Sequence, residues 1–140
     1  MTISTKGRYA LRVMLDMAAH AEEEFLPLKD VAARQEISLK YLERILPELT
    51  KAGMIKGVHG KGGGYRLTRA PEEYTLWEIL CAAEGEMAPV ACLEAGTAPC
   101  PRAEKCLTLP VWQGFYDMAR RYFSEMTLAD VLKAGEKNIP

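Results

Sequence analysis

The pattern of hydrophobic and polar positions predicts a series of short helices interrupted by one hairpin. Residues 9–21 and 28–35 each carry apolar residues at the three-to-four spacing of a buried helix face. A third helix is expected to begin at Ser38, whose hydroxyl can cap free backbone N–H groups, and to end near Gly53. Its buried face consists of Leu42, Ile45, Leu46 and Leu49. Because proline removes a backbone hydrogen bond, we expect a bend at Pro47.

A hairpin is expected directly after the third helix. Two strand-like runs cover residues 54–58 and 65–68, and the glycine-rich residues 60–64 between them supply the positive φ angles of a hairpin tip. Residues 36–38 form a tight turn between the second and third helices, which makes the pair a helix-turn-helix. The predicted fold is therefore mostly α with a small β-hairpin wing, that is, a winged helix-turn-helix domain plus a dimerisation helix.

The second half of the chain contains an irregular loop and one long amphipathic helix. Thr75 and Thr127 are each followed three residues later by an acidic residue, the pattern of a capping box. Residues 85–107 have the Ala, Pro and Gly content of a loop, and Thr108 is expected to cap the long helix. The apolar stripe of that helix is Val111, Phe115, Met118 and Tyr122. Because a small domain does not need this much apolar surface for itself, we expect a partner helix to cover the stripe.

Charge is unevenly distributed although the formal net charge is only −1. Residues 1–69 contain 12 Lys and Arg against 8 Asp and Glu, whereas residues 70–140 contain 6 against 11. A capped helix followed by a basic, glycine-tipped hairpin indicates a recognition helix and a wing that bind double-stranded DNA. We assign residues 1–72 to this DNA-binding domain and residues 73–140 to a sensor loop and dimerisation helices. The expected DNA-binding residues are Ser38, Lys40, Tyr41, Glu43, Arg44, His59, Lys61 and Tyr65.

Several other functions are disfavoured by the same residues. The glycine-rich tip matches neither common phosphate-binding pattern and precedes a strand instead of a helix. No acid–base pair or activated nucleophile is visible, so an enzyme is not expected. Arg12 and Asp16 interrupt the apolar run that a signal peptide would need, and no run is long enough to span a membrane. We expect a cytoplasmic protein; a winged helix that holds a protein partner is a rival interpretation.

Three of the four cysteines fall within one predicted loop. Cys92, Cys100 and Cys106 are spaced C-x7-C-x5-C, and thiolates are soft ligands suited to Fe–S clusters or zinc. The spacing lacks the C-x2-C knuckle that is usual for structural zinc. The helix expected from Thr108 directs the positive end of its dipole toward these thiolates. Cys81 lies among apolar residues of its own helix and is expected to act as a small hydrophobic side chain.

Four features together resemble one family. They are ISTKGRYALRVMLDMA (3–18), SLKYLERIL (38–46), GGGYRL (62–67) and the loop cysteines. In combination they are similar to the winged-helix regulators that include IscR, NsrR and CymR, over about residues 1–133. The resemblance implies a dimeric bacterial transcription regulator whose Fe–S cluster is held by Cys92, Cys100 and Cys106. It also implies that Glu43 faces the DNA bases.

The chain departs from the family pattern at the fourth cluster ligand. The cluster-assembly type has a ligating histidine where this chain has Leu109, and the nitric-oxide-sensing type has a carboxylate near the position of Arg8. The CymR type lacks these cysteines. The fourth ligand is left open between Glu94, Glu104, a water and a small thiol. The choice between a 2Fe–2S and a 4Fe–4S cluster is also open. We expect a dimeric regulator whose operator affinity is controlled by this cluster; the alternative is a cluster-free thiol- or zinc-responsive transcriptional repressor.

Overall fold

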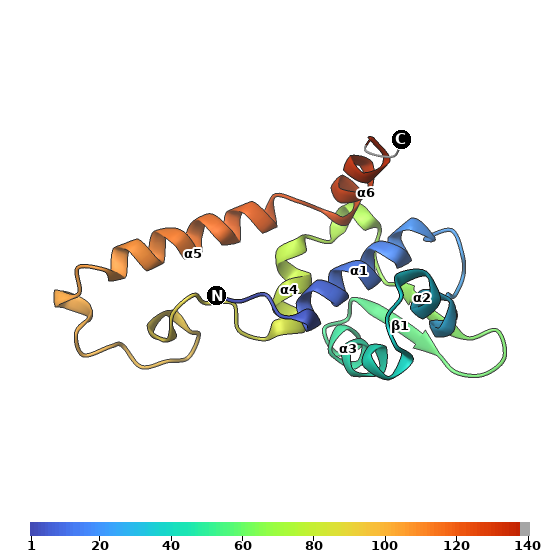
Figure 1. Ribbon diagram of the computed structural model, residues 1–140, viewed down its shortest axis with the longest axis horizontal. Coiled ribbons are helices and arrows are strands. Elements are labelled where there is room, and N and C mark those ends of the chain that lie inside the picture. The colour runs from blue at the N-terminus through green and yellow to red at the C-terminus, as the bar shows by residue number, and fades with distance from the viewer. Residues whose placement is uncertain (138–140) are drawn as a thin grey trace.

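A computed structural model describes residues 1–137 and shows a helical body with a small hairpin on one side and a long helix on the other (Figure 1). Its elements, in chain order, are α1 (Thr5–Ala19), α2 (Leu28–Gln35), α3 (Leu39–Lys51), β1 (Ile55–Val58), β2 (Gly64–Leu67), η1 (Pro71–Glu73), α4 (Leu76–Glu84), η2 (Ala91–Leu93), η3 (Ala103–Lys105), α5 (Leu109–Ser124) and α6 (Leu128–Lys137). The predicted fold class, mostly α with a β-hairpin wing, is confirmed.

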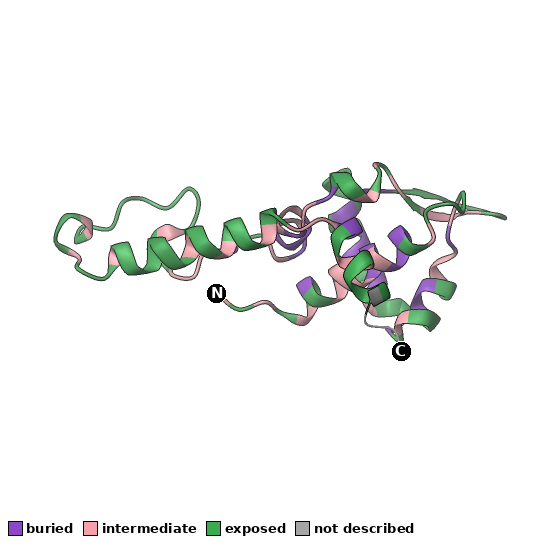
Figure 2. Cartoon of the chain, turned by 90° about the horizontal axis from the view of Figure 1, so that it is seen from above, coloured by how far each residue is buried: buried purple, intermediate pink, exposed green. Residues whose placement is uncertain are grey.

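The hydrophobic core lies where α1, α3, α4 and α6 meet, and Figure 2 shows the buried residues gathered in this body. All four apolar positions expected on α3 are buried, because this face packs against α1 and α4. The helix continues without interruption through Pro47, which is exposed. The wing follows directly from this helix, so the position of α3 also fixes the base of the hairpin.

The hairpin is short and is joined to the body by a third segment. β1 and β2 are antiparallel, with Ile55 opposite Leu67 and Val58 opposite Gly64. Leu26 and Tyr65 exchange two backbone hydrogen bonds of 2.8 and 2.9 Å, which attach the segment before α2 to the outer side of β2. Gly64 has a φ of 152°, and a Cβ there would collide with the Leu26 carbonyl. The glycine is therefore required by this close approach.

The first helix is capped by a residue from the second half of the chain. The Glu84 carboxylate accepts hydrogen bonds from the Ser4 hydroxyl at 2.7 Å, from the Ser4 N–H at 2.9 Å and from the Gly7 N–H at 2.9 Å. The N–H groups of Ser4 and Gly7 are among the free donors that a helix N-terminus leaves. A Cβ at Gly7 would collide with Glu84, so the two positions are matched in size.

A buried carboxylate joins the first two helices. Asp16 on α1 accepts hydrogen bonds from Arg34 at 2.7 Å and from Gln35 at 3.0 Å, both near the end of α2. Burial would by itself raise the pKa of Asp16, but the bonds from Arg34 and Gln35 outweigh it and leave the pKa below its ordinary value. Asp16 is therefore ionised at neutral pH and holds α2 in register on α1.

The two expected capping boxes are present. Thr75 and Glu78 exchange side-chain-to-backbone hydrogen bonds at the start of α4, and Thr127 and Asp130 do the same at the start of α6. The expectation for Thr108 was wrong: it precedes α5, but its side chain makes no capping hydrogen bond. Its hydroxyl lies instead 3.4 Å from the Cys106 sulfur.

Candidate nucleic-acid interface and cysteine loop

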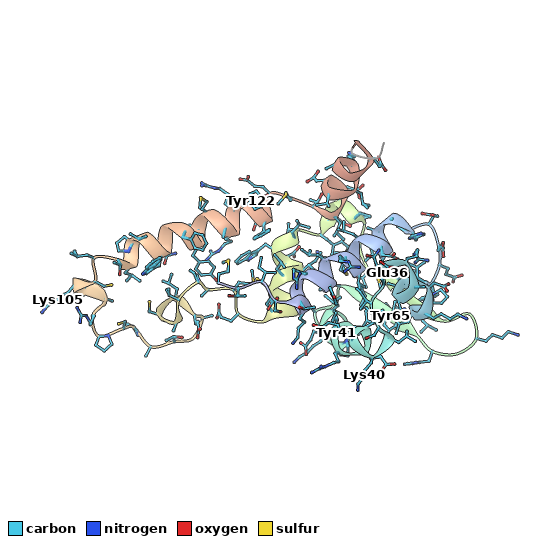
Figure 3. All side chains as sticks on the ribbon, viewed as in Figure 1. Glu36, Lys40, Tyr41, Tyr65, Lys105 and Tyr122 are labelled. Atoms are coloured by element: carbon cyan, nitrogen blue, oxygen red, sulfur yellow. The ribbon has the colours of Figure 1, made fainter. Side chains whose placement is uncertain are left out.

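The start of α3 is built to present polar side chains outward. The Ser38 hydroxyl accepts the Tyr41 N–H at 3.1 Å and so caps the helix. With the apolar face of α3 turned into the core, Lys40, Glu43 and Arg44 are exposed. Within the described residues none of these three side chains forms an ion pair. Their charges are therefore free for an outside partner, and Figure 3 shows Lys40 at the outer edge of the body.

Tyr41 differs from the other expected interface residues of α3 because it is half-buried. Its ring packs edge-on against Tyr9 of α1, with ring centroids 5.2 Å apart, and the Arg12 guanidinium lies 5.1 Å from the Tyr9 ring centre. The sequence predicted that Tyr41 binds DNA, whereas in the structure its ring packs toward α1. Tyr41 thus connects the recognition helix to α1.

The wing carries its charges near its tip and along its strands. His59 and Lys61 are exposed beside glycines with positive φ, as a hairpin tip requires. Tyr65 is half-buried, and its ring lies so close to Gly57 that a Cβ there would collide with it. Tyr65 therefore supports the base of the wing.

Two basic wing residues were not among those expected from the sequence. Lys56 and Arg66 are exposed and stand directly opposite each other across the two strands. Residues directly opposite in an antiparallel pair share one face of the sheet, so these two side chains place two positive charges on one side of the wing. The pairing of these two residues depends on the strand register, which could not be derived from the sequence.

The loop between α4 and α5 carries the three candidate metal ligands. Cys92 and Cys100 are exposed, and Cys106 is partly exposed at the end of η3. The Thr108 hydroxyl and the backbone N–H groups of Thr108 and Leu109 lower the pKa of the Cys106 thiol below its usual value. These groups at the start of α5 thus favour the thiolate form of Cys106.

The structure brings neither the three candidate cysteines nor the nearby acidic side chains together around one point. Glu86 folds the first part of the loop by accepting N–H bonds from Met87, Ala88 and Ala95 at 2.7–3.1 Å. Glu94 and Glu104 are exposed. Within residues 1–137 no three His, Cys, Asp or Glu side chains lie close enough together to hold a metal ion. Cys81 is half-buried, and burial followed by the nearby Glu86 charge raises the pKa of its thiol.

The long helix α5 extends away from the body and leaves its apolar side uncovered (Figures 1 and 2). No residue of α5 is buried, and Phe115 is 43% exposed. One contact with the body is made by Trp77 of α4, whose ring centre is 6.0 Å from that of Tyr116. The exposed apolar residues of α5, here called the α5 stripe, are Val111, Trp112, Phe115, Met118 and Tyr122.

A helix-turn-helix with a basic wing defines the class of winged-helix DNA-binding proteins. A model of the Rrf2 family, whose description is iron-dependent transcriptional regulator, matches residues 3–134. The chain belongs to this family; it is a DNA-binding transcriptional regulator and not an enzyme. No helix within the described part of the chain is long and apolar enough to cross a membrane.

Individual relatives agree with this assignment. The transcriptional regulator IscR of Vibrio atlanticus is 35% identical over 97% of this chain and 78% of its own length. The protein rrf2 of Nitratidesulfovibrio vulgaris is 38% identical over 95% of this chain and 88% of its own length. Among solved structures, IscR of T. potens has a TM-score of 0.78 at 32% identity and covers 100% of this chain and 93% of its own. CymR, the global cysteine regulator of B. subtilis, has a TM-score of 0.77 at 31% identity and covers 96% of this chain and 98% of its own.

Proposed function

We propose that this protein is a homodimeric regulator, acting in the cytoplasm on a palindromic operator, whose DNA affinity is controlled by an Fe–S cluster held at Cys92, Cys100 and Cys106. One observation carries the proposal. The Cys106 thiol, whose pKa is lowered, sits at the N-terminus of the helix that bears the uncovered α5 stripe. The proposed metal ligand and the proposed dimer contact are therefore joined by the same helix, α5.

The α5 stripe supports a second copy of this chain as the partner. Five large apolar residues on one side of a helix form a patch of the kind that marks a protein–protein contact. In a two-fold dimer the same patch on each copy meets its counterpart. The stripe lies away from α3 and the wing (Figure 1), so pairing through it leaves both recognition helices free for the two half-sites of an operator.

The side chains of the cysteine loop fit an Fe–S cluster by their chemistry. All three thiols are at least partly accessible, and soft thiolates are the usual ligands of such clusters. The family is described as iron-dependent, which favours iron over zinc at these ligands. When bound, a cluster would supply iron that is sensitive to redox state and to small ligands such as nitric oxide.

The chain's own residues couple the loop to the DNA-binding helices. The Cys106 sulfur lies 3.4 Å from the Thr108 hydroxyl at the start of α5, so a change in what Cys106 binds alters the start of the dimer helix. Glu84, one residue before the loop, caps α1, and Tyr9 of α1 packs on Tyr41 of α3. Loop state and recognition-helix position are thereby linked, and linkage requires the effect to be reciprocal.

The test begins with anaerobic reconstitution of the whole protein with iron and sulfide. We expect visible charge-transfer absorption with bound iron and sulfide in the wild type, and loss of most of it in Cys92→Ser, Cys100→Ser and Cys106→Ser. The matched control is Cys81→Ser, which should keep the absorption because Cys81 belongs to α4. Stoichiometric zinc with no iron–sulfide absorption would refute the cluster and favour the zinc- or thiol-responsive alternative.

Operator affinity is then compared between reconstituted and cluster-free protein. DNA fragments selected from a random pool by the protein should have two-fold symmetry and should bind the two forms with different affinity. Equal affinity would remove regulation by the cluster from the proposal while leaving the DNA-binding assignment intact. If the selected fragments contain only single, asymmetric half-sites, the proposal that the protein binds DNA as a dimer is refuted.

A further inference from the structure

We propose that Leu39 determines sequence specificity by contacting the C5-methyl group of a thymine in the operator. The inference rests on α3 acting as the recognition helix of the proposed function, and it adds a base contact that the polar residues of α3 cannot make. Thymine is the base that presents an apolar group in the major groove. An exposed aliphatic side chain at the start of α3 is its natural partner.

The distribution of exposed apolar side chains singles out Leu39. Within the described residues, most large hydrophobic side chains with high exposure lie on the α5 stripe or just before it, at Leu107. The two others are Leu39, which is 46% exposed, and Val58, which is 42% exposed. These two lie on the elements that face DNA in a winged helix: Leu39 is the first residue of α3, and Val58 is the last residue of β1.

The fold does not need Leu39 for its own stability. The core face of α3 is complete without it, because Leu42, Ile45, Leu46 and Leu49 fill the space against α1 and α4. Leu39 is not part of the hydrophobic core and is 46% exposed. An apolar residue outside the core at this position is therefore available for a ligand.

Leu39 lies next to Glu43, the other residue of α3 that we expect to contact a base. The first residues of a recognition helix are those that reach base edges. Leu39 and Glu43 are four residues apart, so their Cβ atoms lie about 5–6 Å from each other on one face. Base pairs stack about 3.4 Å apart, which places the two contacts within roughly two base pairs. We expect Leu39 to contact a thymine methyl group at one of these base pairs. At the other, we expect Glu43 to accept a hydrogen bond from a cytosine amino group.

The experiment removes the methyl group from the DNA and the leucine from the protein in turn. The probe is the operator duplex that the wild-type protein selects from random DNA, with each thymine of one half-site replaced singly by uracil. In the wild type we expect one replacement to weaken binding about fourfold, the factor that corresponds to one buried methylene group. Leu39→Ala removes the contact from both half-sites of the dimer, so it should weaken binding to the thymine operator about sixteenfold. It should no longer distinguish uracil from thymine at that position.

Two controls separate this contact from other effects. Val58→Ala removes the second exposed apolar side chain and should keep the thymine preference at the Leu39 position. Leu39→Gln keeps the length of the side chain without its apolar character and should behave like Leu39→Ala, with both variants melting within a few degrees of the wild type. The uracil series on the wild type needs no variant at all, so it remains informative whatever the variants do.

The outcomes are distinguishable from those of the proposed function. The inference is overturned if no thymine shows a methyl effect in the wild type, or if Leu39→Ala and Leu39→Gln retain the full effect while still binding the operator. If the wild type selects no DNA sequence at all, the recognition role of α3 fails and the Leu39 contact fails with it.

Discussion

The helices α3 and α5 have the same kind of sequence pattern but opposite surroundings. Each carries apolar residues at three-to-four spacing along one side. On α3 these residues are all buried by α1 and α4, whereas no residue of α5 is buried. Periodicity therefore shows that a face is apolar, but it does not show whether the covering surface lies in the same chain. The uncovered face is the one that we attribute to assembly.

The largest expected effect comes from a charge placed on the uncovered side. Phe115→Glu should convert the dimer to a folded monomer, because a carboxylate in a desolvated contact is strongly unfavourable. Sedimentation equilibrium measures the mass, and circular dichroism checks the helix content. Gln113→Glu carries the same charge on the opposite side of α5 and should stay dimeric. A folded Phe115→Glu protein that remains a dimer would show that the stripe is not the contact.

A core substitution in α3 should act on folding instead of assembly. Leu46 is almost fully buried, so Leu46→Ala should lower the free energy of unfolding by about 2–5 kcal/mol. Leu39→Ala in the same helix should change it little, because Leu39 is largely exposed. Urea denaturation of both variants at one protein concentration gives the comparison; equal losses would contradict the assignment of these two faces.

Removing the buried carboxylate should have a moderate effect that depends on pH. Asp16→Asn should cost about 1–3 kcal/mol at pH 7, because hydrogen bonds from Arg34 and Gln35 to a charged group are weakened. The pKa of Asp16 is below its ordinary value of 3.8, so its contribution is complete above that value and is lost as the pH falls through the lower folded pKa.

The stability difference between wild type and Asp16→Asn should accordingly shrink in acid. Urea midpoints of both proteins between pH 7 and pH 2.5 measure it. A difference that grows on acidification would mean that Asp16 is protonated more readily in the folded protein than in the unfolded chain.

The smallest expected effect concerns the wing. Lys61 is exposed at the tip, and as a phosphate contact it should bind all sequences alike. Lys61→Ala should therefore reduce the slope of log affinity against log salt by about one unit for each Lys61 that touches a phosphate. Glu22→Ala, an exposed change on the α1–α2 turn, should leave the slope nearly unchanged. An unaltered slope in Lys61→Ala would place this residue away from the DNA.

Local chemistry made most of the fold predictable from the sequence. Caps at Ser38, Thr75 and Thr127 depend on residues within one helical turn, and each appears in the structure. The glycine-rich hairpin tip is equally local. Apolar spacing located α1 and α3, which bury their faces within this chain, and also α5, which does not.

Contacts between distant residues explain what could not be predicted. The half-buried position of Tyr41 depends on Tyr9, which is 32 positions earlier in the sequence, and the shared face of Lys56 and Arg66 depends on strand register. The cysteine spacing identified one loop but not its shape. None of these features can be predicted from residues within a few positions of each other in the sequence.

The cap that Glu84 places on α1 has a consequence for how the protein is made. Gly7 and Glu84 are 77 positions apart, and a ribosome adds about 5–20 residues per second. Glu84 follows the end of α1 by 65 residues, so for on the order of 3–13 s after the first helix is synthesised its N-terminal donors have no carboxylate partner. The recognition helix packs on that same first helix and on α4. A nascent chain therefore gains its DNA-binding shape when α4 emerges, not when the wing does.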